Sequence, residues 1–171
     1  MILMTEYGIS LGSNLGQRLA NLRRARAAIA KLPGVLTVAC SPVYETEPVD
    51  VPAAYRSRRF LNAVLILKTS AQPAELAEAL HAIEARMGRV RTGEANSPRM
   101  IDIDLIYAGR RKIRSATLTI PHPRWARRRF VVRPLADVRP ALKIPGEQRR
   151  VREVLLSLPR TPKVVLYRRR W

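Results

Sequence analysis

Residues 60–67 read Phe-Leu-Asn-Ala-Val-Leu-Ile-Leu, a compact apolar run that contains one amide. A short apolar run with β-branched and aromatic residues is typical of a strand that is buried in a sheet. The run therefore predicts an interior strand, and the segments on either side of it define the fold.

The chain before this run predicts a strand, a helix and a second strand. Residues 7–11 alternate apolar with small or polar side chains, as strands do, and residues 12–14, Gly-Ser-Asn, supply turn and helix-cap chemistry. From residue 15 to 32, apolar side chains recur at helical spacing until Pro33-Gly34 ends the pattern. Residues 35–44 contain β-branched side chains without that spacing and predict a strand.

The chain after the run predicts another helix and another strand. Residues 70–87 combine a cap, an early proline and apolar positions at helical spacing, and residues 100–107 alternate as a strand does. The order β-α-β-β-α-β is the ferredoxin-like arrangement, an α+β sheet with both helices on one face. Beyond residue 109 the signals are shorter, and they predict a hairpin over 110–120, a short helix over 147–158 and a frayed end over 167–171.

The charge is strongly positive and uneven. The chain has 171 residues with 32 Lys and Arg against 13 Asp and Glu, a net charge of +19. Residues 1–109 have 13 basic against 10 acidic residues, whereas residues 110–171 have 19 against 3. Such a field attracts polyanions without specifying which one.

The composition excludes some classes of protein and predicts a compartment. No run approaches the roughly 20 apolar residues that a membrane span needs. Cys40 is the single cysteine, so no internal disulfide can form, and the first residues do not resemble a signal peptide. We expect a cytoplasmic protein without a membrane segment.

Asp102 and Asp104 are the most informative candidate site residues. On a strand, residues i and i+2 point to the same face and lie about 6.6 Å apart along the chain. Two carboxylates on one face could hold one or two Mg²⁺ ions, which prefer oxygen ligands and often bridge to phosphates. A solvated strand face without function explains the pair equally well when the pair is taken alone.

Basic side chains precede this strand. Arg89, Arg91 and Arg99 would place cations beside the carboxylate pair, which suits a metal-bound polyphosphate. The alternative for each arginine is a solvated surface position or an ion pair with Glu84 or Glu94.

Four further side chains are candidates for ligand contacts. His122 lies between two prolines that restrict its backbone, and it could donate to a phosphate. Asn62 offers an amide that matches the edge of a heterocycle, and Phe60 and Phe130 could stack on a flat ligand. A structural histidine and ordinary core packing of the phenylalanines are the alternatives.

These segments together resemble the 6-hydroxymethyl-7,8-dihydropterin pyrophosphokinase family. The resemblance runs in family order over about residues 7 to 140, and the Pro-Arg-x-x-Asp-x-Asp and Pro-His segments are its most specific parts. The matching segments are Gly12–Leu15, Tyr44–Pro48, Phe60–Asn62, Ile83-Glu84 with Gly88–Arg91, Pro98–Asp104, Leu118–His122, and Arg128 with Phe130 and Pro134-Leu135.

The resemblance implies an enzyme and a reaction. The family moves a diphosphate from ATP to the hydroxyl of a pterin in folate biosynthesis, with AMP as the other product. By resemblance, Asp102 and Asp104 would hold two Mg²⁺ ions that bridge the ATP phosphates. Residues 1–140 would form the catalytic domain, and residues 141–171 would be a basic C-terminal extension packed on it or trailing from it.

The resemblance also implies roles for side chains around the phosphates. Arg89 and Arg99 would bind the migrating phosphates as catalytic residues, and Arg91 would assist from its loop. His122 and Arg128 would contact ATP. Glu84 would help to line the nucleotide site.

The pterin site follows from the same resemblance. Phe60 and Phe130 would sandwich the pterin ring, while Asn62, with the backbone around Thr46 and Val49, would contact its edge. The long loops on both sides of these elements would close over the substrates.

Two positions depart from the family pattern. Asn96 stands where many members have a tryptophan, and Thr117 stands where some members have an ATP-binding arginine. Arg114 is nearby, but nothing in the sequence assigns it that role.

A nucleic-acid-binding module is the alternative class, because ferredoxin-like sheets can bind RNA and the chain is basic. Aromatic residues make up only 5% of the chain and do not cluster on a strand, and an Asp-x-Asp pair would repel phosphate in the absence of metal. We therefore expect a monomer that binds small-molecule substrates rather than nucleic acid.

Overall fold

The structure, a computed structural model, describes residues 3–49, 53–88 and 98–171. Its main sheet has six strands, all paired antiparallel, in the order β5-β1-β4-β3-β8, with β2 also paired to β4. The strands are β1 (Thr5–Ser13), β2 (Leu36–Cys40), β3 (Val43–Thr46), β4 (Phe60–Thr69), β5 (Asp102–Ala108) and β8 (Val164–Arg168). A separate hairpin joins β6 (Ile113–Arg114) to β7 (Thr119–Ile120).

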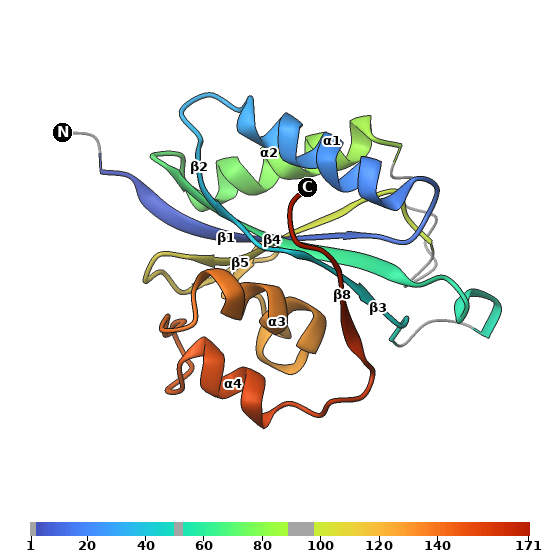
Figure 1. Cartoon of the computed structure of the whole chain (residues 1–171). Coiled ribbons are helices and arrows are strands. Elements are labelled where there is room, and N and C mark those ends of the chain that lie inside the picture. Colours follow the sequence, from blue (N-terminus) through green and yellow to red (C-terminus); the bar gives the residue numbers. More distant parts are fainter. Residues whose placement is uncertain (1–2, 50–52, 89–97) are drawn as a thin grey trace.

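Helices cover both faces of the sheet (Figure 1). Helices α1 (Arg18–Ala30) and α2 (Pro73–Arg86) lie on one face, and α3 (Arg129–Val138) and α4 (Val151–Ser157) lie on the other. Short 3-10 turns occur at Ala53–Tyr55 and Trp125–Arg127. Within the described ranges, no helix is long and apolar enough to cross a membrane.

Strand β4 explains why the run at 60–67 is apolar on both of its faces. Leu61, Leu65 and their odd-numbered neighbours pack in the core under α1 and α2, whereas Val64 and Ile66 pack in a second core under α3 and α4. A strand buried on both faces needs apolar side chains at consecutive positions. The predicted interior strand and the ferredoxin-like order of elements are confirmed.

The strand predicted over residues 35–44 is in fact two strands. The break falls at Ser41-Pro42, because Pro42 has no N–H to donate to a neighbouring strand. At this point the Ser41 hydroxyl replaces a main-chain acceptor, since the Val64 N–H donates to Ser41 Oγ at 2.8 Å. The chain thus bends without leaving that N–H unpaired.

The first helix begins later than the spacing predicts. It starts at Arg18 rather than at residue 15, and its N-cap residue Gln17 makes no side-chain cap. Asn14, which we expected to supply turn or cap chemistry, instead accepts a hydrogen bond from the Arg99 main-chain N–H at 2.8 Å.

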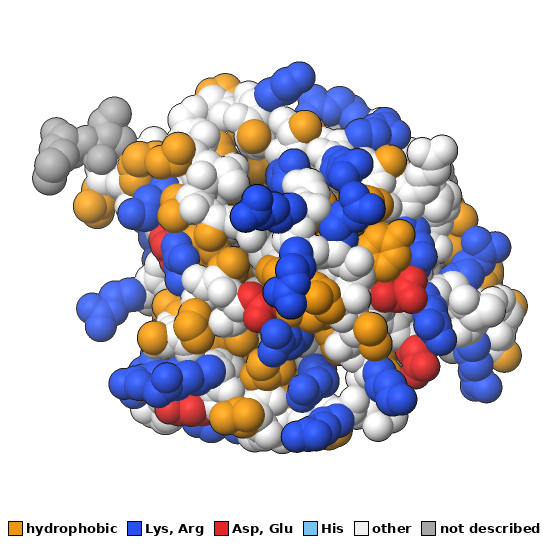
Figure 2. Space-filling view, in the orientation of Figure 1, with side chains coloured by type: hydrophobic (Ala, Val, Ile, Leu, Met, Phe, Trp, Pro, Cys, Tyr) orange, Lys and Arg blue, Asp and Glu red, His pale blue; other side chains and the backbone are white. Residues whose placement is uncertain are grey.

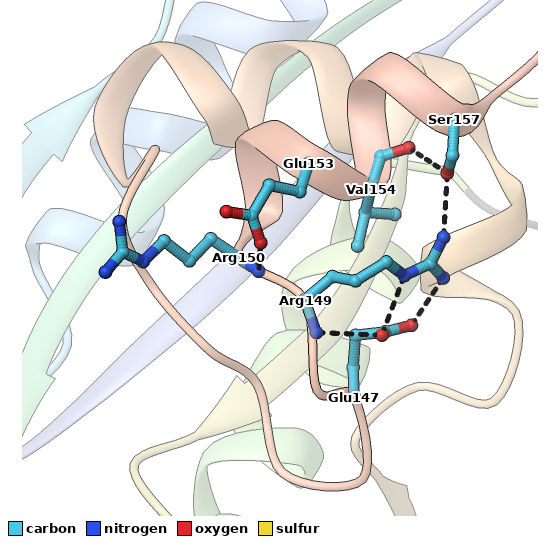
Figure 3. A network of polar contacts seen from close by, with 6 residues as sticks. All are labelled: Glu147, Arg149, Arg150, Glu153, Val154 and Ser157. Carbon is cyan, nitrogen blue, oxygen red and sulfur yellow. Dashed lines mark hydrogen bonds and ion pairs between the residues drawn. The ribbon is translucent and has the colours of Figure 1, made fainter.

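The segment after residue 140 packs against the rest of the chain. Helix α4 contributes Val151, Val154 and Leu155 to the second core. Its start is held by polar contacts (Figure 3): the Arg150 N–H donates to Glu153 at 2.7 Å, and Arg149 forms a two-pronged ion pair with Glu147.

The prediction that residues 167–171 form a frayed end is wrong. Strand β8 pairs with β3, and Trp171 is only 9% exposed. Its indole N–H donates to the Ser41 carbonyl at 2.8 Å, and the Arg26 guanidinium stacks 4.6 Å from its ring centre.

Candidate active site

The floor of the site is built from small residues of β1. Gly12 pairs with Asn62 on one side and with Asp102 on the other, and Ser10 pairs with Asp104. A Cβ atom at position 12 would lie 3.2 Å from Asn62 Oδ1 and 3.9 Å from Asp102 Cβ. Glycine at this position therefore leaves the space between the two flanking strands open.

The two carboxylates lie on the predicted face of β5. Ile103, between them, points into the core under α1 and α2, so Asp102 and Asp104 face the α3 side of the sheet. Arg99 forms an ion pair with Asp102 at 3.1 Å. The main chain of Arg99 is in turn held by both the N–H and the side-chain oxygen of Asn14.

This donor set fits a hard divalent cation that shares its ligands with a substrate. Among residues 3–49, 53–88 and 98–171, no group of three or more His, Cys, Asp or Glu side chains could hold a metal alone. Mg²⁺ is usually bound by one or two carboxylates, with water and substrate phosphates completing its shell. Asp102 and Asp104 match that pattern.

His122 is fixed in place and neutral. Its main-chain N–H donates to the Ile106 carbonyl at 2.9 Å, and its ring Nδ1 accepts a hydrogen bond from the Arg124 main-chain N–H at 3.1 Å. Burial, followed by the charges of Arg128 and Arg124, lowers the pKa of His122 to about 4. At neutral pH the ring proton therefore lies on Nε2, where it can be donated to a ligand oxygen.

The other end of the site combines aromatic rings with an amide. Asn62 donates from Nδ2 to Thr46 Oγ1 at 2.8 Å, which fixes the plane of its side chain. The Arg128 guanidinium lies 5.6 Å from the centre of the Phe130 ring. Phe60 lies opposite Thr46 in the register of β3 and β4.

These residues line one cleft of about 230 Å³, here called the central cleft. It brings together ten of the predicted site residues, from five separate segments of the chain. They are Thr46, Val49, Phe60, Asn62, Arg99, Asp102, Asp104, His122, Arg128 and Phe130.

A second hollow of about 190 Å³, the side cleft, adjoins the first and shares Asp104 and His122 with it. Apolar residues of α2 and β5 and the β6–β7 hairpin form its walls. These apolar residues include Leu80, Leu105 and Leu118. Thr117, which departs from the family pattern, and the exposed His81 also line the side cleft. Asp104 thus lies where two neighbouring clefts meet.

Of the three remaining predicted residues, the structure describes only Glu84. Glu84 is only 2% exposed and lines neither cleft; its carboxylate accepts a hydrogen bond from the Ile103 N–H at 2.6 Å. Arg89 and Arg91 lie outside the described residues, and so does Asn96, which departs from the family pattern.

The central cleft also contains residues that sequence reasoning missed. They are Ser10, Gly12, Glu47, Arg124 and Val131. Gly12 and Ser10 could have been found from strand register, because they pair with Asp102 and Asp104. Arg124 has no comparable sequence signal, since its position depends on the 3-10 turn that follows it.

A comparison with protein families matches residues 8–140 to the family described as 7,8-dihydro-6-hydroxymethylpterin-pyrophosphokinase (HPPK). A Pseudomonas aeruginosa protein named 2-amino-4-hydroxy-6-hydroxymethyldihydropteridine pyrophosphokinase is 37% identical over 151 residues, which are 88% of this chain and 90% of that protein. A Synechocystis protein of the same name is 39% identical over 132 residues, 77% of this chain.

Some relatives are longer proteins. The chain covers 65% of the Synechocystis relative and 27% of an Arabidopsis thaliana folate synthesis bifunctional protein, to which it is 41% identical. Among solved structures, a Plasmodium falciparum HPPK-DHPS chain with pteroate superposes with a TM-score of 0.70 over 90% of this chain and 42% of that one. At 14% identity this match supports the fold alone.

Proposed function

The chain belongs to the 7,8-dihydro-6-hydroxymethylpterin-pyrophosphokinase family, and from that premise we propose that it transfers a diphosphate from ATP to the hydroxyl of 6-hydroxymethyl-7,8-dihydropterin. The observation that supports this most directly is the central cleft. It joins an end suited to a flat heterocycle to a pair of carboxylates surrounded by cations.

The pterin would occupy the aromatic end of the central cleft. Phe60 and Phe130 would contact its two faces, and Asn62, held by Thr46, would contact its edge. Stacking on such rings favours planar ligands by about 0.5–1.5 kcal/mol per pair beyond the area buried. The hydroxymethyl group would then point toward Asp102 and Asp104.

The nucleotide would bind with its phosphates across the same carboxylates and its nucleoside in the side cleft. Asp104 and His122 border both clefts, so a chain of phosphates can pass between them. Arg99 and Arg128, which line the central cleft, would bind phosphate oxygens, and neutral His122 would donate from Nε2. Arg89 and Arg91 stay predicted phosphate ligands.

The proposed reaction is an in-line displacement. The pterin hydroxyl oxygen would attack the β-phosphorus of ATP and release its proton to solvent, while the bond from that phosphorus to the oxygen bridging the α-phosphate breaks and AMP leaves. Two Mg²⁺ ions held by Asp102 and Asp104 would neutralise charge on the phosphates. The protein would act mainly by positioning the two substrates and by electrostatic stabilisation.

The test is AMP formation by purified protein supplied with ATP, Mg²⁺ and 6-hydroxymethyl-7,8-dihydropterin. We expect AMP only when the pterin is present, and none when Mg²⁺ is removed by a chelator. Folded protein that binds ATP but forms no pterin-dependent AMP would overturn the proposal. A cytoplasmic, monomeric enzyme stays our prediction.

A further inference from the structure

A third hollow, the arginine groove, adjoins the aromatic end of the central cleft and shares no described lining residue with the side cleft. It measures about 300 Å³. It shares Thr46, Val49, Arg124, Arg128 and Phe130 with the central cleft, but the proposed reaction uses neither Arg127 nor the segment 158–164. One wall is the segment 124–130 that leads into α3, and the other is the segment 158–164 between α4 and β8 (Figure 1). The second wall lies beyond residues 8–140, which match the family.

The groove is lined by cations. Arg124, Arg127, Arg128 and Arg129 all border it, and none of its described lining residues is acidic. Figure 2 shows how common Lys and Arg side chains are on the face of the molecule that it draws, but these four line a single hollow. A concave site focuses their field more than a convex surface would.

Two of the four guanidinium groups, those of Arg124 and Arg127, have no role in the proposed reaction, and that of Arg128 borders both the groove and the central cleft. Arg129 is occupied, because its guanidinium donates to the carbonyls of Leu155 and Leu158 at 3.2 and 3.1 Å and so fixes the second wall. Arg124 and Arg127 are exposed, and Arg128 is half-buried. Burial, and then the charge of Arg124, lowers the pKa of Arg128, as expected where cations lie together.

The remaining surface of the groove is largely apolar. Val49 and Phe130 form its inner side, where it meets the central cleft, and Leu158, Pro162 and Val164 form its outer side. A free inorganic anion would leave this surface unused. A molecule with an anionic group and a compact organic body would contact both parts.

We propose that the arginine groove is a second binding site, for a small organic phosphate whose phosphoryl group contacts Arg124, Arg127 and Arg128. Arg forks match phosphate oxygens, and 300 Å³ suits a ligand of mononucleotide size. The ligand could be a free nucleotide or the diphosphate ester formed in the proposed reaction. Arg127 and the segment 158–164 line the groove and not the central cleft, so the proposal can be tested separately from that reaction.

The test is calorimetric titration of the full chain with AMP, and separately with the pterin diphosphate, in low salt and without divalent cations. Under these conditions Asp102 and Asp104 disfavour phosphate in the central cleft. We expect Arg127→Glu to weaken binding of at least one ligand tenfold or more. Arg127 lines the groove but not the central cleft, so pterin-dependent AMP formation should persist in this variant.

The matched control is Arg23→Glu, which makes the same charge change at an exposed position on α1, on the other face of the sheet. The affinity of this variant for AMP and for the pterin diphosphate should stay within twofold of the wild-type affinity. Equal weakening by both variants, or no binding of either ligand by the wild type at millimolar concentration, would overturn the proposal. Groove binding in a wild-type protein that forms no AMP would overturn only the proposed reaction.

Discussion

At the residue scale, Asp104 is the side chain on which the proposed chemistry depends most. It borders both the central cleft and the side cleft, and it shares the α3-facing side of β5 with Asp102. Asp104→Asn keeps the size of the side chain but removes the charge that a divalent cation requires. We expect turnover to fall by orders of magnitude in steady-state assays of AMP formation, with an unchanged circular dichroism spectrum.

The matched control for this variant is Glu78→Gln, which removes one negative charge from an exposed position on α2. Its turnover should equal that of the wild type. Near-normal turnover of Asp104→Asn would remove Asp104 from the proposed metal site.

His122 supplies a prediction about pH. Its pKa is about 4 in the folded protein because of burial and the neighbouring Arg128 and Arg124, and about 6.5 in an unfolded chain. Between these values the unfolded state binds the additional proton. Stability should therefore fall as the pH drops from about 6.5 to about 4, and this contribution should change no further below that range.

An NMR titration of the imidazole should locate the low pKa directly. Denaturant unfolding at several pH values should show that His122→Gln loses part of the acid sensitivity, whereas His81→Gln, at an exposed position, keeps it. A His122 pKa near 6.5 would contradict the prediction.

At the scale of elements, Glu84 links α2 to β5. Strand β5 is at the edge of the sheet, and the outward N–H of Ile103, between the two aspartates, is satisfied by the buried Glu84 carboxylate. Glu84→Leu leaves this N–H without its acceptor, at a cost of about 1–3 kcal/mol. Urea unfolding should measure that loss, and kcat should fall with little change in KM for ATP.

Glu84→Gln keeps a carbonyl oxygen that can accept the same hydrogen bond, so it should recover most of the stability and turnover. If Gln and Leu variants behave alike, or if KM for ATP rises while kcat is kept, Glu84 acts on the nucleotide instead of on the strand.

The elements that sequence predicted best are those with a clear period. Alternation over 100–107 placed Asp102 and Asp104 on one face, and helical spacing located α1 and α2. Helix α3 was missed because Pro134 lies inside it and its apolar positions form only a short stretch. Strand β8 was missed because its partner β3 is distant in sequence and because its last residue, Arg168, is followed by two more arginines.

The sequence predicted the site about as well as it predicted the fold. Motifs on strands and in the Pro-His turn identified residues that line the central cleft together, because regular elements fix where side chains point. Arg124 and the arginine groove depend on how the 158–164 segment returns across the start of α3, and no local pattern encodes that path.

At the scale of the whole molecule, Trp171 connects the last residues to the opposite side of the sheet. Its indole contacts Ser41 and stacks on Arg26, and its carbonyl accepts a hydrogen bond from Arg26. Trp171→Ala should lower the free energy of unfolding by about 3 kcal/mol, as is usual for loss of a packed aromatic side chain. Chemical denaturation measures this, with the exposed Arg169→Ala as the control. If both variants unfold at the same denaturant concentration, Trp171 adds no stability.

The net charge of +19 makes a separate prediction about polyanions. Any affinity for duplex DNA should fall steeply as salt rises, and should survive Asp104→Asn, because it comes from counterion release rather than from the cleft. Fluorescence anisotropy at 50 and 300 mM salt would test this. Salt-insensitive, sequence-selective binding would favour the nucleic-acid alternative.

The position of β4 between the two cores has a consequence for how the molecule unfolds. Residues 61–67 are all buried, and the strand pairs with β1, β2 and β3. Main-chain amides in such a strand exchange with deuterium only when the cooperative unit around them unfolds. Asn62 belongs to that strand, so the end of the cleft proposed to hold the pterin should persist through local opening elsewhere and be lost only with the native state itself.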